Sequence, residues 1–110
     1  MEEYDIKSHR HFESNMERSI RLVNREVINP LVAPFTEERI LAFAVEVAKL
    51  RGAYLKLALD VGLPDKPGST TFELKTMREA YEEARDAFAA LMTAIERGYV
   101  DIPSQDSATT

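Results

Sequence analysis

The sequence predicts an all-α protein, an antiparallel three-helix bundle with up-down-up order that assembles into a homodimeric helical bundle. Three observations support this fold class. Apolar residues recur with a helical period in three segments of similar length. Start and stop signals bound these segments, and the links between them are short. We therefore expect one domain over residues 1–98, with helices at about 8–29, 37–61 and 71–97, and a polar C-terminal tail at 99–110.

The first helix is expected to start near Ser8, or at Asp5 if that residue is the cap, and to end at Asn29. Pro30 sets this end because a proline disfavours helical backbone in the residue before it. The apolar stripe of this helix is only about 80° wide. It consists of Phe12, Met16, Ile20, Val23 and Val27.

The second helix has a clear beginning and end. Thr36 is a good N-cap, and Glu37 and Glu38 complement the helix dipole in the first turn. The helix is expected to continue to about Val61, where Gly62 stops it. The two prolines and the glycine of the following link keep the chain irregular.

The third helix is expected to begin at a capping box formed by Thr70 and Glu73. Its end fits a Schellman motif centred on Gly98, and the polar residues beyond are expected to fray. Its core side carries the apolar residues Leu74, Met77, Tyr81, Ala84, Phe88, Leu91, Met92 and Ile95.

The apolar surface of the second helix is too wide for a three-helix bundle. It covers an arc of about 240°, whereas a surface helix normally buries about 100°. Two neighbouring helices leave part of such an arc uncovered, which predicts self-association, most simply as a homodimer or a higher homo-oligomer. Gly52 is interpreted as a site of close backbone packing. The alternative is neutral sequence drift at an exposed position. The predicted self-association surface is Leu41, Val45, Ala48, Gly52, Leu55 and Leu59.

Composition and charge narrow the classes of partner. The chain has no cysteine, so disulfides, thiolate nucleophiles and cysteine-based metal sites are excluded. Its net charge of −5 disfavours nucleic acid as a partner. The N-terminus is acidic where a secretory signal would be basic, and no apolar run is long enough for a membrane span. We expect a cytoplasmic protein that binds neither nucleic acid nor membrane.

Arg51 is the most unusual residue of the second helix because it lies within the apolar arc. A charged side chain there must form an ion pair, bind an anion or extend toward solvent. An ion pair would use a carboxylate such as Glu17, Glu82 or Glu83. As an anchor for a small acidic ligand, Arg51 would act with the hydroxyl groups of Tyr54 and Tyr81.

The histidines lie together near the start of the first helix, but His9 and His11 project about 200° apart and cannot bind one ion jointly. His9 and Glu13 are four residues apart, and Glu17 follows one turn later. These three residues are the candidate metal ligands, although a firm site would need ligands from another helix. The alternative is that His9 is a partly buried residue at the edge of the core.

Four arginines share one face of the first helix, opposite its apolar stripe. An acidic face on the third helix contains Glu79, Glu82, Glu83 and Asp86. Both faces are consistent with simple solvation. Alternatively, the arginine face docks an acidic protein partner or the acidic face of another copy. This candidate partner-binding face is Arg10, Arg18, Arg21 and Arg25.

No catalytic motif accompanies these features. The sequence has no glycine-rich phosphate loop, no nucleophile elbow and no His-Glu-x-x-His motif. We therefore expect a non-catalytic interaction protein, acting as an adaptor, regulator or accessory subunit without a cofactor. The alternative is a helical bundle that binds a small ligand or a metal ion, with possible enzymatic activity, through Arg51, Tyr54 and Tyr81 or through His9 and Glu13.

Overall fold

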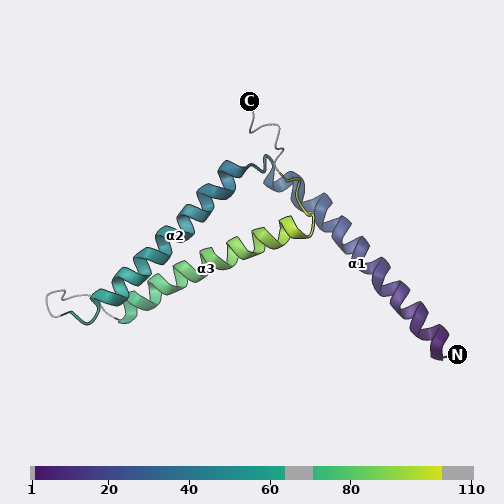
Figure 1. Cartoon of the computed structure of the whole chain (residues 1–110), viewed down its shortest axis with the longest axis horizontal. Helices are drawn as coiled ribbons and strands as arrows, with labels where there is room; N and C mark the ends of the chain where they lie inside the picture. The colour runs from purple at the N-terminus through teal and green to yellow at the C-terminus, as the bar shows by residue number, and fades with distance from the viewer. Residues whose placement is uncertain (1, 64–70, 103–110) are drawn as a thin grey trace. The chain divides into compact units, whose positions relative to one another are not determined.

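The computed structural model describes residues 2–63 and 71–102. In these two ranges the chain forms three α-helices and no strand: α1 (Glu2–Val32), α2 (Glu37–Asp60) and α3 (Thr71–Glu96) (Figure 1). The prediction of an all-helical chain with three helices is thereby confirmed. None of the helices described combines the length and the apolar character that crossing a membrane requires.

The first helix is longer than expected at both ends. It begins at Glu2 and continues past Pro30 to Val32. Proline has no backbone N–H, so Pro30 removes one helical hydrogen bond, and its fixed φ is compatible with helical backbone. The preference against helix in the residue before Pro30 therefore does not end α1 at Asn29.

The start of α2 follows the predicted capping pattern. Thr36 has extended backbone (φ −120°, ψ 156°), and its hydroxyl oxygen accepts a hydrogen bond from the backbone N–H of Arg39 at 3.3 Å. Glu37 and Glu38 occupy the first turn. The predicted N-cap is confirmed. By contrast, the capping box expected for the third helix involves Thr70, which lies outside the described residues.

The end of α3 is the predicted Schellman motif. Gly98 has a positive φ of 74°, which glycine adopts without steric strain. The backbone N–H of Gly98 donates to the carbonyl of Ile95 at 3.1 Å, and that of Tyr99 donates to the carbonyl of Ala94 at 2.9 Å. This is the bond pair that defines the motif.

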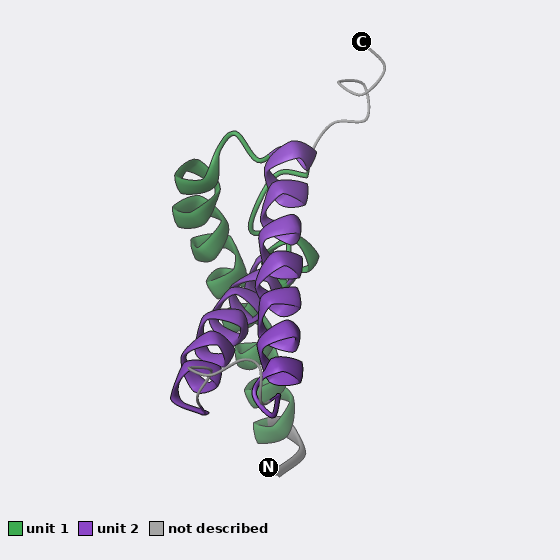
Figure 2. Ribbon diagram, turned by 90° about the vertical axis from the view of Figure 1, so that its left-hand side faces the viewer, with its two compact units in different colours: residues 1–35, 93–110 green, residues 36–92 purple. Residues whose placement is uncertain are grey.

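The chain divides into two compact units, coloured separately in Figure 2. One unit contains residues 1–35 and 93–110, and the other contains residues 36–92. The division falls within α3, between Met92 and Thr93.

In the unit of residues 36–92, α2 and α3 form an antiparallel pair. Phe43 lies near Phe88, and Tyr54 lies near Tyr81, with ring centroids 6.1 Å apart in both pairs. The partially buried positions of α3 alternate three and four residues apart, the spacing of a coiled-coil seam. Within this unit the residues with that spacing are Leu74, Met77, Tyr81, Ala84, Phe88 and Leu91, and Glu82 is also partially buried.

The core of this helix pair is thin. Within residues 36–63 and 71–92, only Val47 is buried, with 7% of its surface exposed. Most of the stability of a short helix comes from packing its apolar face and not from intrinsic propensity. A pair with one buried side chain therefore leaves much of the apolar surface of α2 without a packing partner within this unit.

In the other unit, the segment after α3 is ordered by contacts with α1. Val100 is buried, with 3% exposed. Fraying was expected from Val100 onward, but Val100 is buried and Asp101 is bound by the polar contacts described in the next subsection. The remainder of the expected tail, residues 103–110, lies outside the described residues.

Candidate functional site

One flank of α2 exposes a continuous set of apolar side chains. The exposed fractions are 66% for Leu41, 44% for Val45, 54% for Leu55 and 79% for Leu59. Ala48 and Gly52 lie between them and are also exposed. A Cβ atom added at Gly52 would have no described atom within 4 Å other than those of its chain neighbours and its own helix backbone. The six residues predicted for self-association thus form one exposed surface, which we call the α2 flank.

The α2–α3 pair also carries a cluster of cationic and aromatic side chains. The Nε of Arg51 donates a hydrogen bond to the phenol oxygen of Tyr81 at 3.0 Å. The Tyr54 ring stacks on that of Tyr81 with an interplanar angle of 21°. The structure therefore brings together all three residues predicted as a ligand site.

A fourth member of this cluster was not identified from the sequence. The guanidinium carbon of Arg85 lies 5.5 Å from the centroid of the Tyr81 ring, and that of Arg51 lies 5.4 Å from it. Both are cation–π distances. Arg85 follows Tyr81 by four residues on α3, and this spacing was the signal that could have identified it.

The electrostatics of the cluster depend on how the two arginines are paired. The hydrogen bond from Arg51 is the main cause that lowers the pKa of Tyr81 below its ordinary value. Arg85 contacts the carboxylate of Asp86 at 3.3 Å, which raises the pKa of Arg85. Within residues 36–63 and 71–92, Arg51 has no ion pair with a carboxylate, including those of Glu82 and Glu83.

Within the described part of its unit, Arg51 therefore reaches a phenol and not a carboxylate. Its guanidinium retains N–H donors beyond the one used by Tyr81. An anion is the natural partner for those donors.

An open apolar groove of about 560 Å³ lies where α2 and α3 are joined. It was not predicted from the sequence, and it contains Phe72, which has 76% of its surface exposed. The groove is lined by Leu57, Phe72, Glu73, Thr76, Met77 and Ala80.

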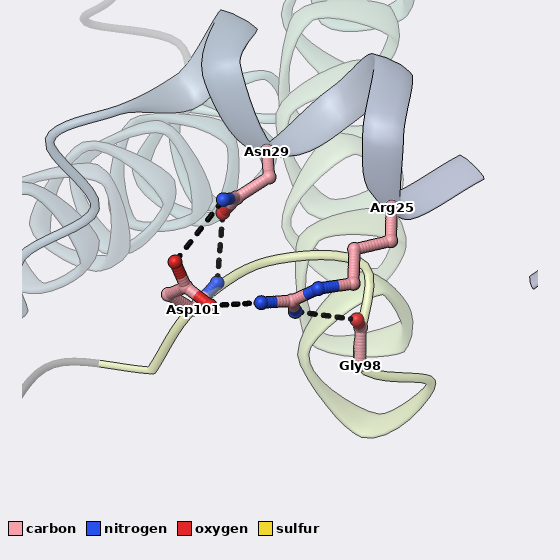
Figure 3. Close-up of polar contacts among 4 residues, drawn as sticks. All are labelled: Arg25, Asn29, Gly98 and Asp101. Carbon is pink, nitrogen blue, oxygen red and sulfur yellow. Dashed lines mark hydrogen bonds and ion pairs between the residues drawn. The ribbon is translucent and has the colours of Figure 1, made fainter. Parts of the chain in front are cut away.

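The other unit contains a polar network, which we call the Asp101 clasp (Figure 3). Arg25 donates to the carbonyl of Gly98 at 3.0 Å and also forms an ion pair with Asp101. Asn29 donates from Nδ2 to Asp101 at 3.1 Å, and its Oδ1 accepts from the backbone N–H of Asp101 at 2.9 Å. These contacts, led by the hydrogen bond from Arg25, lower the pKa of Asp101.

The clasp engages one residue of the predicted arginine face. Because Arg25 binds Asp101, the arginines left for a partner are Arg10, Arg18 and Arg21. Arg21 also lines a pocket of about 310 Å³ with Glu17, Ile20, Arg97 and Tyr99. A hydrogen bond to the Tyr99 side chain raises the pKa of Arg97.

The candidate metal ligands are only partly brought together. His9 Nε2 lies 3.0 Å from Glu13 Oε1, and both side chains are exposed. Over residues 2–63 and 71–102, no three side chains of the His, Cys, Asp or Glu type are grouped so that they could hold a metal ion. Glu17 lines the pocket next to Arg21 instead.

The acidic face of α3 is largely paired with basic residues of the same helix. Lys75 contacts Glu79 at 3.9 Å, and Arg78 contacts Glu82 at 3.8 Å, each four residues along the helix. Asp86 contacts its neighbour Arg85. Exposed pairs of this kind contribute little to stability, and they reduce the net negative charge of this face.

Comparison of the chain with family models, with curated proteins and with solved structures gave no match in any of the three.

Proposed function

We propose that the chain is a non-catalytic helical interaction protein, an adaptor, regulator or accessory subunit, that self-associates through α2 and binds a protein partner. The observation that carries this proposal is the exposure of the α2 flank, where four large apolar side chains are 44% to 79% exposed. Its location in the cytoplasm and the lack of catalysis follow from the sequence and remain part of the proposal.

The energy of covering the flank supports association. Burying a Leu or Val side chain completely is worth about 1.5–3 kcal/mol, so the exposed fractions correspond to roughly 4–7 kcal/mol per chain as an upper value. Two chains would gain about twice that amount. Association costs about 4–15 kcal/mol in lost motion, so a dimer of modest affinity is expected.

The arginine face supports the second part of the proposal, a protein partner. Arg10 and Arg18 are exposed and lie on α1, away from the clasp. Together with Arg21 they present positive charge on a chain whose net charge is −5. An acidic protein segment has the complementary charge, and such a contact should weaken as salt is added.

Sedimentation velocity over a wide range of protein concentrations tests self-association. We expect the wild-type mass to rise toward a dimer with concentration and the Leu41→Lys, Leu59→Lys double variant to remain monomeric. The matched control is Ala42→Lys with Ala53→Lys, which adds the same charge to exposed positions of α2 outside the flank. A wild-type monomer at every concentration, or equal loss in both double variants, would contradict the proposal.

A second candidate function is binding of a small acidic ligand at Arg51, Tyr54 and Tyr81. The hydrogen bond between Arg51 and Tyr81 favours it, because it holds an arginine that has no carboxylate partner among the described residues of its unit beside two phenol rings. Titration with inorganic phosphate and with acetate, followed through the ring resonances of the tyrosines, tests this function. Saturable shifts that Arg51→Gln abolishes and Lys49→Gln retains are expected, and linear shifts in both variants would refute it.

The metal form of this second function would use His9 and Glu13, whose side chains are in contact. Elemental analysis of the purified protein and native mass spectrometry distinguish it from the leading proposal. Stoichiometric metal in the wild type that is lost in His9→Gln would support metal binding at this site. Purified protein that carries no metal ion and binds none would refute it.

A further inference from the structure

The residues of the α2 flank are arranged almost symmetrically about position 50. Leu41 and Leu59 each lie nine residues from this position, and both are large. Val45 and Leu55 each lie five residues away. Ala48 and Gly52, the two smallest members, each lie two residues away. Read from either end of α2, the flank therefore presents a leucine, then a valine or a leucine, and then a small residue.

We propose that the α2 flank pairs with the α2 flank of a second copy, antiparallel and about a two-fold axis that passes near residue 50. This inference rests on the proposed self-association and specifies its geometry. In a two-fold contact each surface patch meets itself. A residue that precedes the axis by a given number of positions then faces a residue of the second copy, the one that follows the axis by the same number of positions. Leu41 faces Leu59 of the second copy, and Val45 faces Leu55.

The small residues support a close approach at the axis. Ala48 would face Gly52 of the second copy, and both pairs of this kind would lie next to the two-fold axis. Apart from the neighbours of Gly52 and the backbone of its own helix, no described atom lies within 4 Å of a Cβ built at this position, so the space above it is open in the described part of the chain. Small side chains at a helix crossing shorten the distance between the axes, which increases packing on both sides.

Charge favours the antiparallel over the parallel arrangement. Glu37 and Glu38 lie in the first turn of α2. A parallel pair would bring four carboxylates together at one end, together with the like ends of the two helix dipoles. The antiparallel pair separates the two acidic ends by the length of the helix. It leaves the two copies of Arg51 near the axis, so salt should strengthen association or leave it unchanged.

The area available predicts a weak dimer. From Leu41 to Leu59 the flank is about 27 Å long, and a helix is about 10 Å wide. The contact would then bury on the order of 600 Å² in total, below the roughly 1,200 Å² of a stable specific interface. A dissociation constant in the micromolar range or weaker is expected, so the test needs concentrations of that order.

Thiol cross-linking of the full-length chain tests the register, since the chain has no cysteine of its own. Leu41→Cys and Leu59→Cys variants are treated with a short thiol cross-linker, separately and as an equimolar mixture. In the proposed dimer, two copies of position 41 lie about 27 Å apart, whereas position 41 lies beside position 59 of the second copy. We expect cross-linked dimer only in the mixture. Ala53→Cys mixed with Leu59→Cys is the control and should give none.

Sedimentation of the same variants separates failure of this inference from failure of the proposed function. Cross-linking within each single variant would indicate a parallel pair, and association without cross-linking would indicate another contact surface. Both outcomes overturn the antiparallel register and leave self-association standing. A monomer at all concentrations, with no cross-link in the mixture, overturns both.

Discussion

Arg51 of α2 donates a hydrogen bond from its Nε to the phenol oxygen of Tyr81 on α3, at 3.0 Å. The bond accounts for a charged residue in a strongly apolar helix. Arg51 is exposed, so its guanidinium is accessible to solvent while its Nε is bonded to Tyr81. The structural need for Arg51 is therefore met without a carboxylate among the described residues of its unit.

This relationship predicts the titration of Tyr81. Replacing Arg51 with Gln should raise the pKa of Tyr81 toward its ordinary value, because the hydrogen bond from Arg51 is the main cause that lowers it. Tyrosine-selective labelling with NMR titration resolves Tyr81 from the other tyrosines. Lys49→Gln removes a positive charge from the same helix without touching Tyr81 and is the control. An unchanged Tyr81 titration in Arg51→Gln would contradict the assignment.

The sign of the associated pH dependence follows from this lowered pKa. Because folding favours the phenolate of Tyr81, its contribution to stability is complete above the unfolded pKa of about 10. The contribution is lost as the pH falls through the lower, folded value. The difference in unfolding free energy between wild type and Arg51→Gln should therefore widen as the pH rises through that range.

Gly52→Ala should have opposite effects on the folded chain and on its association. Gly52 lies within α2, has no unusual φ and has open space around it, so alanine should stabilise the chain by about 0.5–1 kcal/mol. If Gly52 packs against a second copy, the added methyl group should weaken the dimer. Denaturation at low concentration and sedimentation at high concentration measure the two effects.

Gly98→Ala is the contrasting variant for this experiment. Gly98 has a φ of 74°, so alanine there should destabilise the chain by about 1–2 kcal/mol although the surrounding space is also open. Stabilisation by both substitutions would refute the backbone argument. Equal dimer affinity of wild type and Gly52→Ala would remove Gly52 from the contact.

The prediction of secondary structure from the sequence depended on local signals, and these were reliable. The Thr36 cap and the Gly98 stop each depend on hydrogen bonds within a few residues, and both are present. The end of α1 was placed too early because the preference against helix before Pro30 is weak compared with the continuity of a long helix. Local propensity fixes such a boundary only where nothing else competes.

The candidate sites show where sequence reasoning stops. Arg51, Tyr54 and Tyr81 were grouped correctly because helical periodicity placed them on facing sides of α2 and α3. The Asp101 clasp was missed because Arg25 and Asp101 are 76 residues apart, and no helical spacing relates them. Arg25 and Asn29, four residues apart on one face of α1, were the only trace of it. Contacts between segments that are far apart in the sequence can be recognised only once the fold is known.

Val47→Ala should destabilise the chain more than any other small change on α2. Val47 is 7% exposed, and removing two buried methyl groups costs about 1.5–2.5 kcal/mol with the cavity that remains. Val45→Ala is chemically identical but lies on the exposed flank, so it should change the stability of the monomer by less than about 0.5 kcal/mol. Chemical denaturation at low concentration measures both. Similar losses would contradict the burial pattern of α2.

Asn29→Ala should loosen the segment after α3 without unfolding α1. The variant removes the acceptor for the Asp101 backbone N–H and one donor to its carboxylate. Each such bond is worth about 0.5–1.5 kcal/mol, so the Asp101 amide should exchange with solvent roughly two- to tenfold faster. Amide exchange by NMR measures this rate. Asn24→Ala removes a bond within α1 only and is the control, and an equal effect in both variants would refute the clasp.

The clasp should also open at low pH. The hydrogen bonds from Arg25 and Asn29 lower the pKa of Asp101, so the docked segment favours the carboxylate. The resulting stabilisation is complete above the undocked pKa of about 3.9 and is lost as the pH falls through the lower, docked value. The methyl resonances of the buried Val100 should report this opening in an acid titration.

Two variants make this acid titration decisive. Asp101→Asn removes the ionisable group, so its Val100 signals should not change over the acid range in which the wild-type clasp opens. Arg25→Gln removes the main cause of the shift, so the transition should move to higher pH. The ion pair is exposed, and added salt should therefore move the wild-type transition in the same direction. An acid transition that persists unchanged in Asp101→Asn would assign the opening to another group.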